Sequence, residues 1–480
     1  MRFALPTRAA VLAAAALLLA AAGPARAETG YGPLPPHNPY AGPDGTATMH
    51  GDTGSSDVTP LPGPRPGPLA SDRVALQSAC PTVLVGSDGY PVALCTTIFG
   101  LTPTVHLLDP ADGGSLAELP LAKGSLLGGV YAYLDQRDRL VAVDGDGALL
   151  RIGHHRTAAG AWALTVDSRL PLAGAVPAGD AVTGISPDWQ GRVWFATGGG
   201  VVGTADDRTG VVRALALPAG ERIANSISTA PAGTAVATTH ATYLLTADAD
   251  GAPRIAWRRA YDRGPGRKPG QLSWGTGSTP TFFGPGTGTD YVTVVDNAAP
   301  TVNLLVYRAG DGSQVCSVPV LRAGGSGSEN SPVAVGNTVL VASTYGYPYP
   351  KLPEDAGPGV PSSGGFRGGL SRVDVRADGS GCDLVWDNRV RSAAVPRLST
   401  ADGLLHTVLR EPVIPGTDAT SVLDPYYYAE IDPRTGAVVR TEYTGAGFLF
   451  DTLQMVGSIA PGGVVYQGTT TGVLRITAAG

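Results

Sequence analysis

The sequence predicts an all-β fold of many short strands, and three features of its composition support that prediction. Glycine and proline are frequent, with 67 and 41 residues in a chain of 480, and both interrupt helices and favour turns. Only 15% of the residues are charged, against about 25% in an average globular domain, which disfavours helical bundles and coiled coils. The hydrophobic share of 43% is too high for a disordered chain. Short apolar runs separated by tight turns are typical of β structure.

The N-terminal residues 1–27 have the pattern of a secretory signal peptide. Arg2 and Arg8 make the start basic, and residues 9–22 are uncharged and rich in Ala and Leu. This run is shorter than the roughly 20 residues that span a bilayer, and residues 25–27 (Ala-Arg-Ala) fit the rule for cleavage. We therefore expect cleavage after Ala27 and export to the extracellular space, with no membrane span. We also expect a monomer.

The formal net charge of −6 becomes more negative when the arginines of residues 1–27 are lost. Because phosphate binding needs a basic surface, we expect no nucleic-acid partner. The basic run from Arg258 to Lys268 is interrupted by Asp262 and is interpreted as a solvated loop.

Four cysteines allow three disulfide pairings, and an exported chain favours their oxidation. Cys80 and Cys95 flank a single predicted turn, residues 86–89, so a local bridge is the favoured pairing. Cys316 and Cys382 then pair across neighbouring units. Zinc is disfavoured, because no C-x-x-C pair or histidine cluster accompanies these cysteines.

The chain after the signal peptide divides into two parts by composition. Residues 28–72 are dense in proline, Gly, Ser and Thr, so they are predicted to form an extended arm or linker. Residues 73–480 alternate short runs of Val, Leu, Thr and Tyr with Gly, Asp and Pro turns. This second part is predicted to be one β-propeller.

Two recurring turn patterns support the propeller. The first is a small or acidic turn before a strand that ends in Thr, at residues 86–97, 186–197, 230–239 and 460–470. The second is an apolar strand before an Asp-Pro turn and another strand, at residues 105–114 and 431–439. The two in succession make a four-stranded meander, which must stack on its neighbours to bury both faces. A pair of β-sandwiches explains the strands but not the repeating turns.

The repeat gives about eight blades, with seven as the alternative. The last unit, residues 451–480, has room for three strands, and a strand near residues 73–79 is predicted to complete it and close the ring. The insertions at residues 345–369 and 411–425 are predicted to be surface loops. The predicted units begin near Cys80, Gly128, Asp180, Asn225, Gly277, Ser328, Ser392 and Asp451.

The sequence contains no strong catalytic motif, so the candidate site rests on the fold. The innermost strands of a propeller line a central funnel, and the polar residues that open these strands are expected to converge there. The alternative explanation is structural: such polar residues also start strands because they cap turns, or they bind buried water in the channel. The candidates are Asp180, Asn225, Ser278, Thr279, Glu329 and Asn330, together with Asp296 and Asn297 at the end of a strand.

These residues suit two kinds of chemistry. Carboxylate and amide oxygens are the ligands of calcium, and the candidate metal ligands are Asp180, Asn225, Asp296, Asn297, Glu329 and Asn330. Glu329 and Asp296 are the candidate catalytic groups, as a general base or a ligand. Asn225, Ser278 and Thr279 are candidates for substrate binding, and His50 and Asp52 join them if the arm folds over the funnel.

Several runs resemble a family of secreted, quinoprotein-like propeller proteins. They are residues 224–226, 275–281, 295–300, 328–331 and 395–399, with residues 37–41 and 49–52 of the arm. The resemblance covers nearly the whole mature chain and implies the fold and export. Arg397, within one of these runs, is assigned to substrate binding.

A broader similarity is to calcium-dependent lactonase propellers, and it implies Ca²⁺ as the cofactor to consider. Pyrroloquinoline quinone is disfavoured as a cofactor. The adjacent cysteine pair that stacks on this quinone in many quinone-dependent dehydrogenases is absent from the sequence.

Two functions follow, and the sequence does not decide whether the protein is an enzyme. The first is a secreted propeller that binds a polar small molecule, glycan or protein at its central funnel. The alternative is a divalent-cation-dependent hydrolase, lactonase or lyase that uses the funnel carboxylates and amides.

Overall fold

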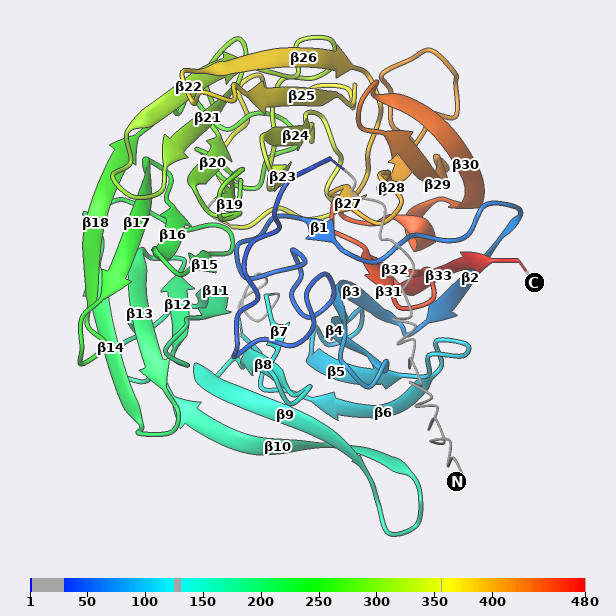
Figure 1. Cartoon of the computed structure of the whole chain (residues 1–480). Coiled ribbons are helices and arrows are strands. Elements are labelled where there is room, and N and C mark those ends of the chain that lie inside the picture. The colour runs from blue at the N-terminus through cyan, green and yellow to red at the C-terminus, as the bar shows by residue number, and fades with distance from the viewer. Residues whose placement is uncertain (2–29, 125–130, 355, 480) are drawn as a thin grey trace.

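Eight β-sheets stand around a central channel in the computed structural model (Figure 1). The structure describes Met1 and residues 30–124, 131–354 and 356–479. Apart from Met1, the predicted signal peptide lies outside these residues. The ring has eight blades, which confirms the propeller and selects eight over seven.

Each blade is an antiparallel meander in which the chain runs from the channel to the rim. The first four blades consist of β3 (Ser78–Val85), β4 (Pro91–Thr97), β5 (Pro103–Leu108) and β6 (Ser115–Pro120); β7 (Tyr133–Leu134), β8 (Leu140–Val143), β9 (Ala148–Arg156) and β10 (Trp162–Pro171); β11 (Val182–Pro187), β12 (Val193–Thr197), β13 (Val201–Asp206) and β14 (Val211–Ala216); and β15 (Ser228–Ala230), β16 (Gly233–Ala237), β17 (Ala241–Ala247) and β18 (Pro253–Ala260).

The remaining blades follow the same order, and the last two also take strands from the N-terminal part of the chain. They consist of β19 (Thr281–Phe283), β20 (Tyr291–Val295), β21 (Asn303–Arg308) and β22 (Gln314–Pro319); β23 (Val333–Val335), β24 (Thr338–Ala342), β25 (Leu370–Val375) and β26 (Cys382–Asn388); β1 (Val58–Thr59), β27 (Arg397–Ser399), β28 (Leu405–Arg410), β29 (Pro425–Asp432) and β30 (Ala437–Ala446); and β31 (Ser458–Ala460), β32 (Val464–Thr469), β33 (Gly472–Ala478) and β2 (Leu69–Ala75).

The two predicted turn patterns lie where the repeat requires them. Residues 86–90 join β3 to β4 and residues 188–192 join β11 to β12, so the first pattern links the inner strand to the second. Residues 109–114 join β5 to β6, so the second pattern links the third strand to the outer one. Gly128 lies outside the described residues, and every other predicted unit start lies in an inner strand or up to seven residues before one.

The ring is closed by β2, which pairs antiparallel with β33 from Leu69 opposite Ala478 to Ala75 opposite Gly472. The closing strand was predicted at residues 73–79, and it begins four residues earlier. The boundary drawn between residues 72 and 73 therefore falls inside β2. Blue β2 lies beside red β33 in Figure 1.

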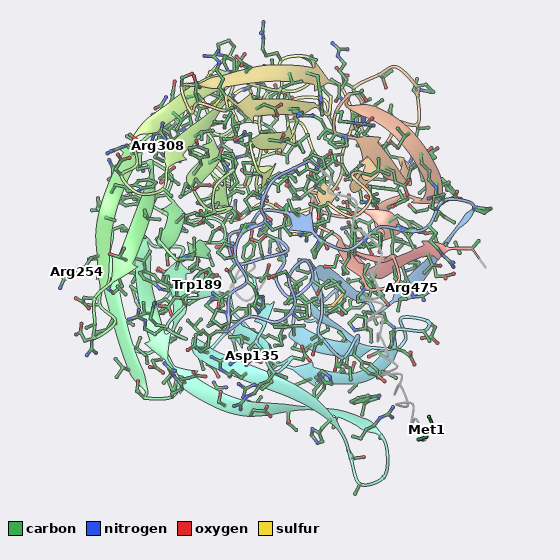
Figure 2. The ribbon with its side chains drawn as sticks, in the orientation of Figure 1. Met1, Asp135, Trp189, Arg254, Arg308 and Arg475 are labelled. Atoms are coloured by element: carbon green, nitrogen blue, oxygen red, sulfur yellow. A yellow bond between two sulfur atoms is a disulfide. The ribbon has the colours of Figure 1, made fainter. Side chains whose placement is uncertain are left out.

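The core lies between the blades. One apolar cluster joins Leu94 and Val105 of the first blade to Leu134, Leu140 and Leu150 of the second, all at most 3% exposed. The outer strands alternate exposed and covered positions, as in β6, because only one of their faces meets a neighbour. Side chains accordingly fill the ring from the inner strands to the rim (Figure 2).

The disulfides pair as predicted. Cys80–Cys95 joins adjacent strands of the first blade, and Cys316–Cys382 joins the outer strands β22 and β26 of neighbouring blades. In the part of the chain that the structure describes, no helix is long and apolar enough to cross a membrane; a short 3₁₀ helix, η1, covers Phe448–Phe450.

The segment predicted as an arm or linker enters the central channel. Residues 46–59 are almost entirely buried, and β1 adds a parallel strand to β27. Backbone N–H groups of six inner strands donate to arm carbonyls at 2.6–3.1 Å: Val85 to Thr46, Leu134 to Ala47, Thr229 to Thr53, Phe282 to Gly54, Ala334 to Ser56 and Leu398 to Asp57. An inner strand is a sheet edge with unpaired backbone groups. The arm carbonyls accept hydrogen bonds from N–H groups on six of these edges.

Two predicted surface segments are partly buried. Within the insertion at residues 345–369, Tyr347 and Phe366 are only 2% and 0% exposed and pack against the seventh blade. In the basic run, Arg267 is covered and donates to the carbonyls of Gly357 and Gln271, so it is not a solvated residue. The local sequence did not reveal this burial, because one acceptor, the Gly357 carbonyl, comes from a segment 90 residues away.

Candidate functional site

The loops that lead into the inner strands meet at one end of the channel, which we call the mouth. Asn225 lies before β15, Glu329 and Asn330 lie before β23, and Tyr131 lies before β7. Asn225 Oδ1 accepts a hydrogen bond from the Tyr131 hydroxyl at 3.2 Å, and the Asn225 amide donates to the Gly277 carbonyl. The Asn225 side chain also lowers the pKa of Glu329 by hydrogen bonding. Three blades thus bring an amide, a carboxyl and a phenol together.

Glu329 is the most unusual group at the mouth. Its side chain is buried, and neither carboxyl oxygen has a hydrogen bond of ordinary geometry among the described residues. Burial raises the pKa of Glu329 to about 7, although the nearby N–H groups of Leu272 and Ser273 and the Asn225 amide lower it. Near neutral pH this carboxyl is poised to donate or to accept a proton.

Gly277 provides the space for this carboxyl. A Cβ atom at Gly277 would lie 2.1 Å from Glu329 Oε2, so any side chain here would displace the carboxyl. Glycine at this position therefore permits the close approach of the fifth blade's entry loop to Glu329.

Two tyrosines that sequence reasoning missed complete the mouth. The Tyr131 hydroxyl also bonds Thr279, and burial raises the pKa of this phenol. Tyr349, in the insertion of the sixth blade, has its pKa raised by burial and by the charge of Glu329. The sequence signal for Tyr131 is its place directly before an inner strand, the criterion that selected Asn225 and Glu329.

Asn330 and Ser278 extend the contacts around the channel. The Ser278 hydroxyl donates to the Asn330 carbonyl at 3.0 Å. The Asn330 amide donates to Gln454 Oε1 at 3.1 Å, and Gln454 Nε2 donates to the Ser392 carbonyl at 3.0 Å. Predicted residues of the fifth and sixth blades are thereby joined to the seventh and eighth.

Three predicted metal ligands are instead bonded to other parts of the fold: Asp180 and Asp296 within their own blades, and Asn297 to the segment between β18 and β19. Asp296 accepts from the backbone N–H and the amide of Asn303 at 2.6 and 2.8 Å. The Asn297 amide donates to the carbonyls of Arg263 and Gly266, and Asp180 accepts from the N–H groups of Ala181 and Gly199. The described residues contain no group of three or more His, Cys, Asp or Glu side chains arranged to hold a metal ion.

The arm residue His50 binds Asp57, and not the Asp52 with which it was predicted to act. His50 Nδ1 lies 3.0 Å from Asp57 Oδ1 and 3.1 Å from Ser331 Oγ, and the Ser331 hydroxyl donates to Asp57 Oδ2. A serine nucleophile needs the opposite ring nitrogen from the one that the carboxylate holds. Asp57 and Ser331 both lie at the same ring nitrogen, Nδ1, which is not that arrangement. The buried group of His50, Asp57 and Ser331 instead connects the arm to the sixth blade.

Asp52 in the arm and Arg397 beside it, both predicted to bind substrate, are also buried. Arg397 is 1% exposed and donates to the carbonyls of Met49 at 2.7 Å and Gly457 at 3.2 Å, with Nη1 3.8 Å from Asp57 Oδ1. Asp52 accepts from the Ser56 hydroxyl, and burial raises its pKa to about 7. The Arg397 side chain therefore holds the arm in the channel, whereas Asp52 fixes the fold of the arm itself.

A cavity of about 200 Å³ adjoins the mouth. Leu272 and Ser273, whose N–H groups lie near Glu329, form one wall, and Trp274 forms another. The Arg263 guanidinium lies 4.1 Å from the centre of the Trp274 ring, and Trp274 is 42% exposed. Sequence reasoning missed Trp274, although a tryptophan in a polar entry loop is a signal that could have found it.

The comparisons with known proteins agree with the fold. A quinohemoprotein alcohol dehydrogenase from Comamonas testosteroni is 11% identical and aligns with a TM-score of 0.53 over 90% of this chain and 80% of its own. A europium-containing methanol dehydrogenase is also 11% identical, with a TM-score of 0.51 over 90% of this chain and 98% of its own. The chain has a quinoprotein-like β-propeller fold. No protein-family model and no curated protein matches the sequence.

Proposed function

We propose that this chain is an exported β-propeller that binds a small polar ligand at the mouth of its channel. The observation that carries the proposal is Glu329, a buried carboxyl without a well-formed hydrogen bond to the described residues, beside Asn225 and Tyr131. Burying such a group costs stability unless a partner compensates it. A ligand hydroxyl or amine at Glu329 supplies that partner.

The groups at the mouth suit a ligand rich in hydroxyl groups. The carboxyl of Glu329 donates when protonated and accepts when ionised, and the Asn225 amide and the Tyr131 phenol each donate and accept. Trp274 offers an apolar face at the adjoining cavity. The arm fills the channel on the other side, so the ligand reaches Glu329 from the mouth.

The cation-dependent hydrolase is the weaker proposal. Calcium takes six to eight oxygen ligands. Asp296 and Asp180 accept hydrogen bonds within their own blades, and the Asn297 amide donates to carbonyls of the segment between β18 and β19. Glu329, Asn225 and Asn330 alone are too few to fit that demand. We transfer no cofactor or substrate from the two dehydrogenases, because a likeness at 11% identity concerns the fold alone.

The decisive experiment is calorimetric titration of the mature protein with monosaccharides, polyols, amino sugars, sugar lactones and calcium chloride. We expect saturable binding of at least one hydroxyl-rich compound, weakened about tenfold or more in Glu329→Gln. Glu118→Gln is the matched control, because the Glu118 side chain is 68% exposed on the outer strand β6.

A second pair of variants tests the same site by changing the space around Glu329. Gly277→Ala places a methyl group against Glu329 and is expected to weaken binding, whereas Gly310→Ala meets open space. Unchanged affinity in both Glu329→Gln and Gly277→Ala would refute binding at the mouth. A calcium heat signal that Glu329→Gln abolishes would instead support the hydrolase.

A further inference from the structure

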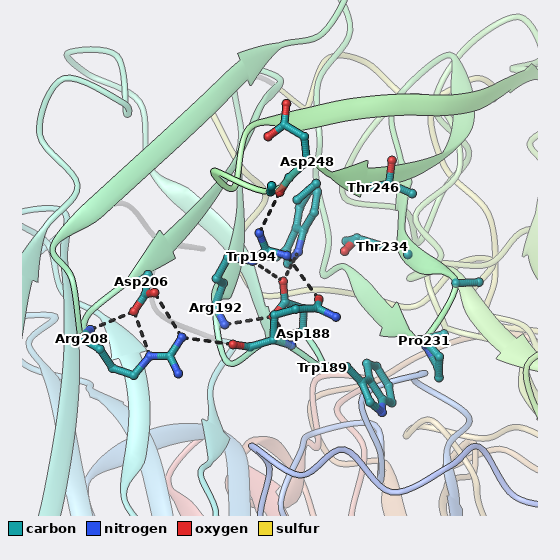
Figure 3. A pocket seen from close by; sticks show the side chains of 16 residues that line it. Asp188, Trp189, Arg192, Trp194, Asp206, Arg208, Pro231, Thr234, Thr246 and Asp248 are labelled. Carbon is teal, nitrogen blue, oxygen red and sulfur yellow. Dashed lines mark hydrogen bonds and ion pairs between the residues drawn. The ribbon is translucent and has the colours of Figure 1, made fainter.

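A second cavity, of about 510 Å³, lies between the third and fourth blades (Figure 3). It is formed by the turns after β11, β13, β15 and β17. Successive strands of a meander run in opposite directions, so these turns lie at the opposite end of the blades from the loops of the mouth. This cavity is therefore separate from the proposed ligand site.

The charges around the cavity are balanced in pairs. Asp188 accepts from Arg192 Nε at 2.8 Å, Asp206 accepts from Arg208 Nε at 3.1 Å, and Asp248 accepts from Arg254. Each carboxylate has its own guanidinium, and Asp206 and Asp248, which each accept three hydrogen bonds, keep capacity for a further one. A ligand with a net charge finds no unpaired counter-charge among these six groups, whereas a neutral polar ligand finds both donors and acceptors.

The polar groups are also fixed before any ligand binds. The Asp188 carboxylate accepts from the backbone N–H groups of Gln190 and Arg192 and from Trp194 Nε1. Arg192 Nη1 donates to the Asp248 carbonyl at 3.2 Å and so links the two blades. Such preorganisation lowers the entropy cost of binding.

The arm supports the same turn from the channel side. A Cβ atom at Gly191 would lie 2.6 Å from the Tyr40 ring, so glycine lets this ring pack against the turn that carries Trp189. The arm thus helps to hold in place the loop that carries the Trp189 indole.

Trp189 gives the cavity an apolar face. Its ring is half-buried, lies near Pro231, and has no hydrogen bond within the described residues (Figure 3). The Thr246 hydroxyl on the facing blade is exposed and also without a partner there. A pyranose ring presents an apolar C–H face and a rim of hydroxyl groups, which match an indole face bordered by paired carboxylates, guanidinium groups and a free hydroxyl.

We propose that this cavity binds a neutral saccharide, with one sugar ring packed on Trp189 and its hydroxyl groups bonded to Asp206, Asp248 and Thr246. The volume of about 510 Å³ lies in the range of small-molecule sites, roughly 300–1,000 Å³. The site is independent of Glu329, so the chain carries two polar sites at opposite ends of its blades.

The test is calorimetric titration of the mature protein with the neutral trisaccharides maltotriose, cellotriose, xylotriose, mannotriose and triacetylchitotriose, and with anionic trigalacturonic acid. We expect at least one neutral trisaccharide to bind, with little change in affinity between low and high salt because no net charge is neutralised. Trp189→Ala is expected to weaken that binding about tenfold or more.

A control variant shows whether the trisaccharide binds at this cavity or elsewhere on the molecule. Trp162→Ala removes another half-buried surface tryptophan, in the second blade, and is expected to leave trisaccharide affinity unchanged. The melting temperature of Trp189→Ala shows whether the variant is folded, and Thr246→Val provides a second, milder change at the same cavity. Three results would each overturn the proposal: no neutral trisaccharide binds, Trp189→Ala and Thr246→Val bind as the parent does, or trigalacturonic acid binds more tightly and with strong salt dependence.

Discussion

At the scale of single residues, Glu329 shows how burial makes a common side chain chemically useful. A carboxyl in water has lost its proton well below neutral pH, whereas burial raises the pKa of Glu329 to about 7. Three neighbouring donors counteract the effect only in part. The protein therefore keeps at its mouth a group that destabilises the fold when ionised, which is a common property of binding and catalytic sites.

This cost predicts a pH dependence of stability. The folded pKa of Glu329 lies above its reference value of 4.5, so the folded state binds more protons between about pH 4.5 and 7, and stability falls as the pH rises through that range. Glu329→Gln removes this contribution. We expect the variant to gain up to about 3 kcal/mol over the parent at pH 8, and nothing at pH 4.

Urea unfolding at both pH values measures the difference. Asp52, whose pKa is also raised to about 7, contributes the same sign of slope, so the variant keeps part of the pH dependence. A parent and a variant that lose the same free energy of unfolding between pH 4 and pH 8 would contradict the assignment.

At the scale of elements, the arm behaves as an internal strand shared by six blades. The inner strands β7, β15, β19, β23, β27 and β31 have only two or three residues each, and each exposes an edge to the channel. Arm carbonyls accept hydrogen bonds from N–H groups of most of these edges, and buried ionic contacts hold the arm in register. The arm thereby fills the channel that the inner strands surround.

Arg397 is the residue on which arm docking is expected to depend most. Its guanidinium binds the Met49 carbonyl and lies near Asp57, and the side chains of Arg397 and Asp57 are at most 1% exposed. Arg397→Met leaves Asp57 without that charge, and loss of one member of a buried pair costs about 3–5 kcal/mol. We expect lower thermal stability and faster proteolysis within residues 42–59.

Arg434→Met is the control, since this arginine is 79% exposed and pairs at the surface with Asp432. The double variant Arg397→Met/Asp57→Asn is expected to recover part of the loss, because it also removes the unpaired charge. Equal melting temperatures for Arg397→Met and Arg434→Met would show that the arm is held by its backbone contacts alone.

At the scale of the whole molecule, segments distant in sequence close the ring. Outer strand β2 comes from residues 69–75 and pairs with β33 at residues 472–478, so the first and last parts of the propeller share one blade. Between the channel and β2, the Gly63 N–H donates to Asp402 Oδ2 at 2.7 Å. The N-terminal segment therefore both fills the channel and completes the circle, which ties the closure of the ring to arm docking.

The two disulfides are predicted to contribute unequally to the stability of the ring. Cys316–Cys382 spans a sequence separation of 66 and joins two blades, whereas Cys80–Cys95 spans 15 within one blade. Loop-closure entropy gives about 4 kcal/mol for the longer loop and about 3 kcal/mol for the shorter one. Chemical unfolding of the two paired Cys→Ala variants is expected to show the larger loss for Cys316/Cys382, and the reverse order would contradict the entropic account.

Much of the candidate site was visible in the sequence, but only as a set of possibilities. Asn225, Ser278, Thr279, Glu329 and Asn330 were selected because they precede inner strands, and they do gather at the mouth. Asp296 and Asp180 met similar criteria but bond within their own blades, and the Asn297 amide bonds the segment between β18 and β19. The choice between the two groups depends on side-chain direction, which residue type and spacing do not encode.

The sequence alone determined the all-β class, the blade repeat, the disulfide pairing and the need for a closing strand, because turn chemistry and hydrophobic pattern act over a few residues. Only the tertiary structure decided that residues 46–59 fill the channel, that Tyr131 and Asn225 flank Glu329, and that Trp189 faces a cavity. One clue to the arm was present: between Pro43 and Pro60 it contains no proline, so its backbone is free to bond the inner strands. Those bonds join residues far apart in the chain, and their partners are fixed only when the ring has closed.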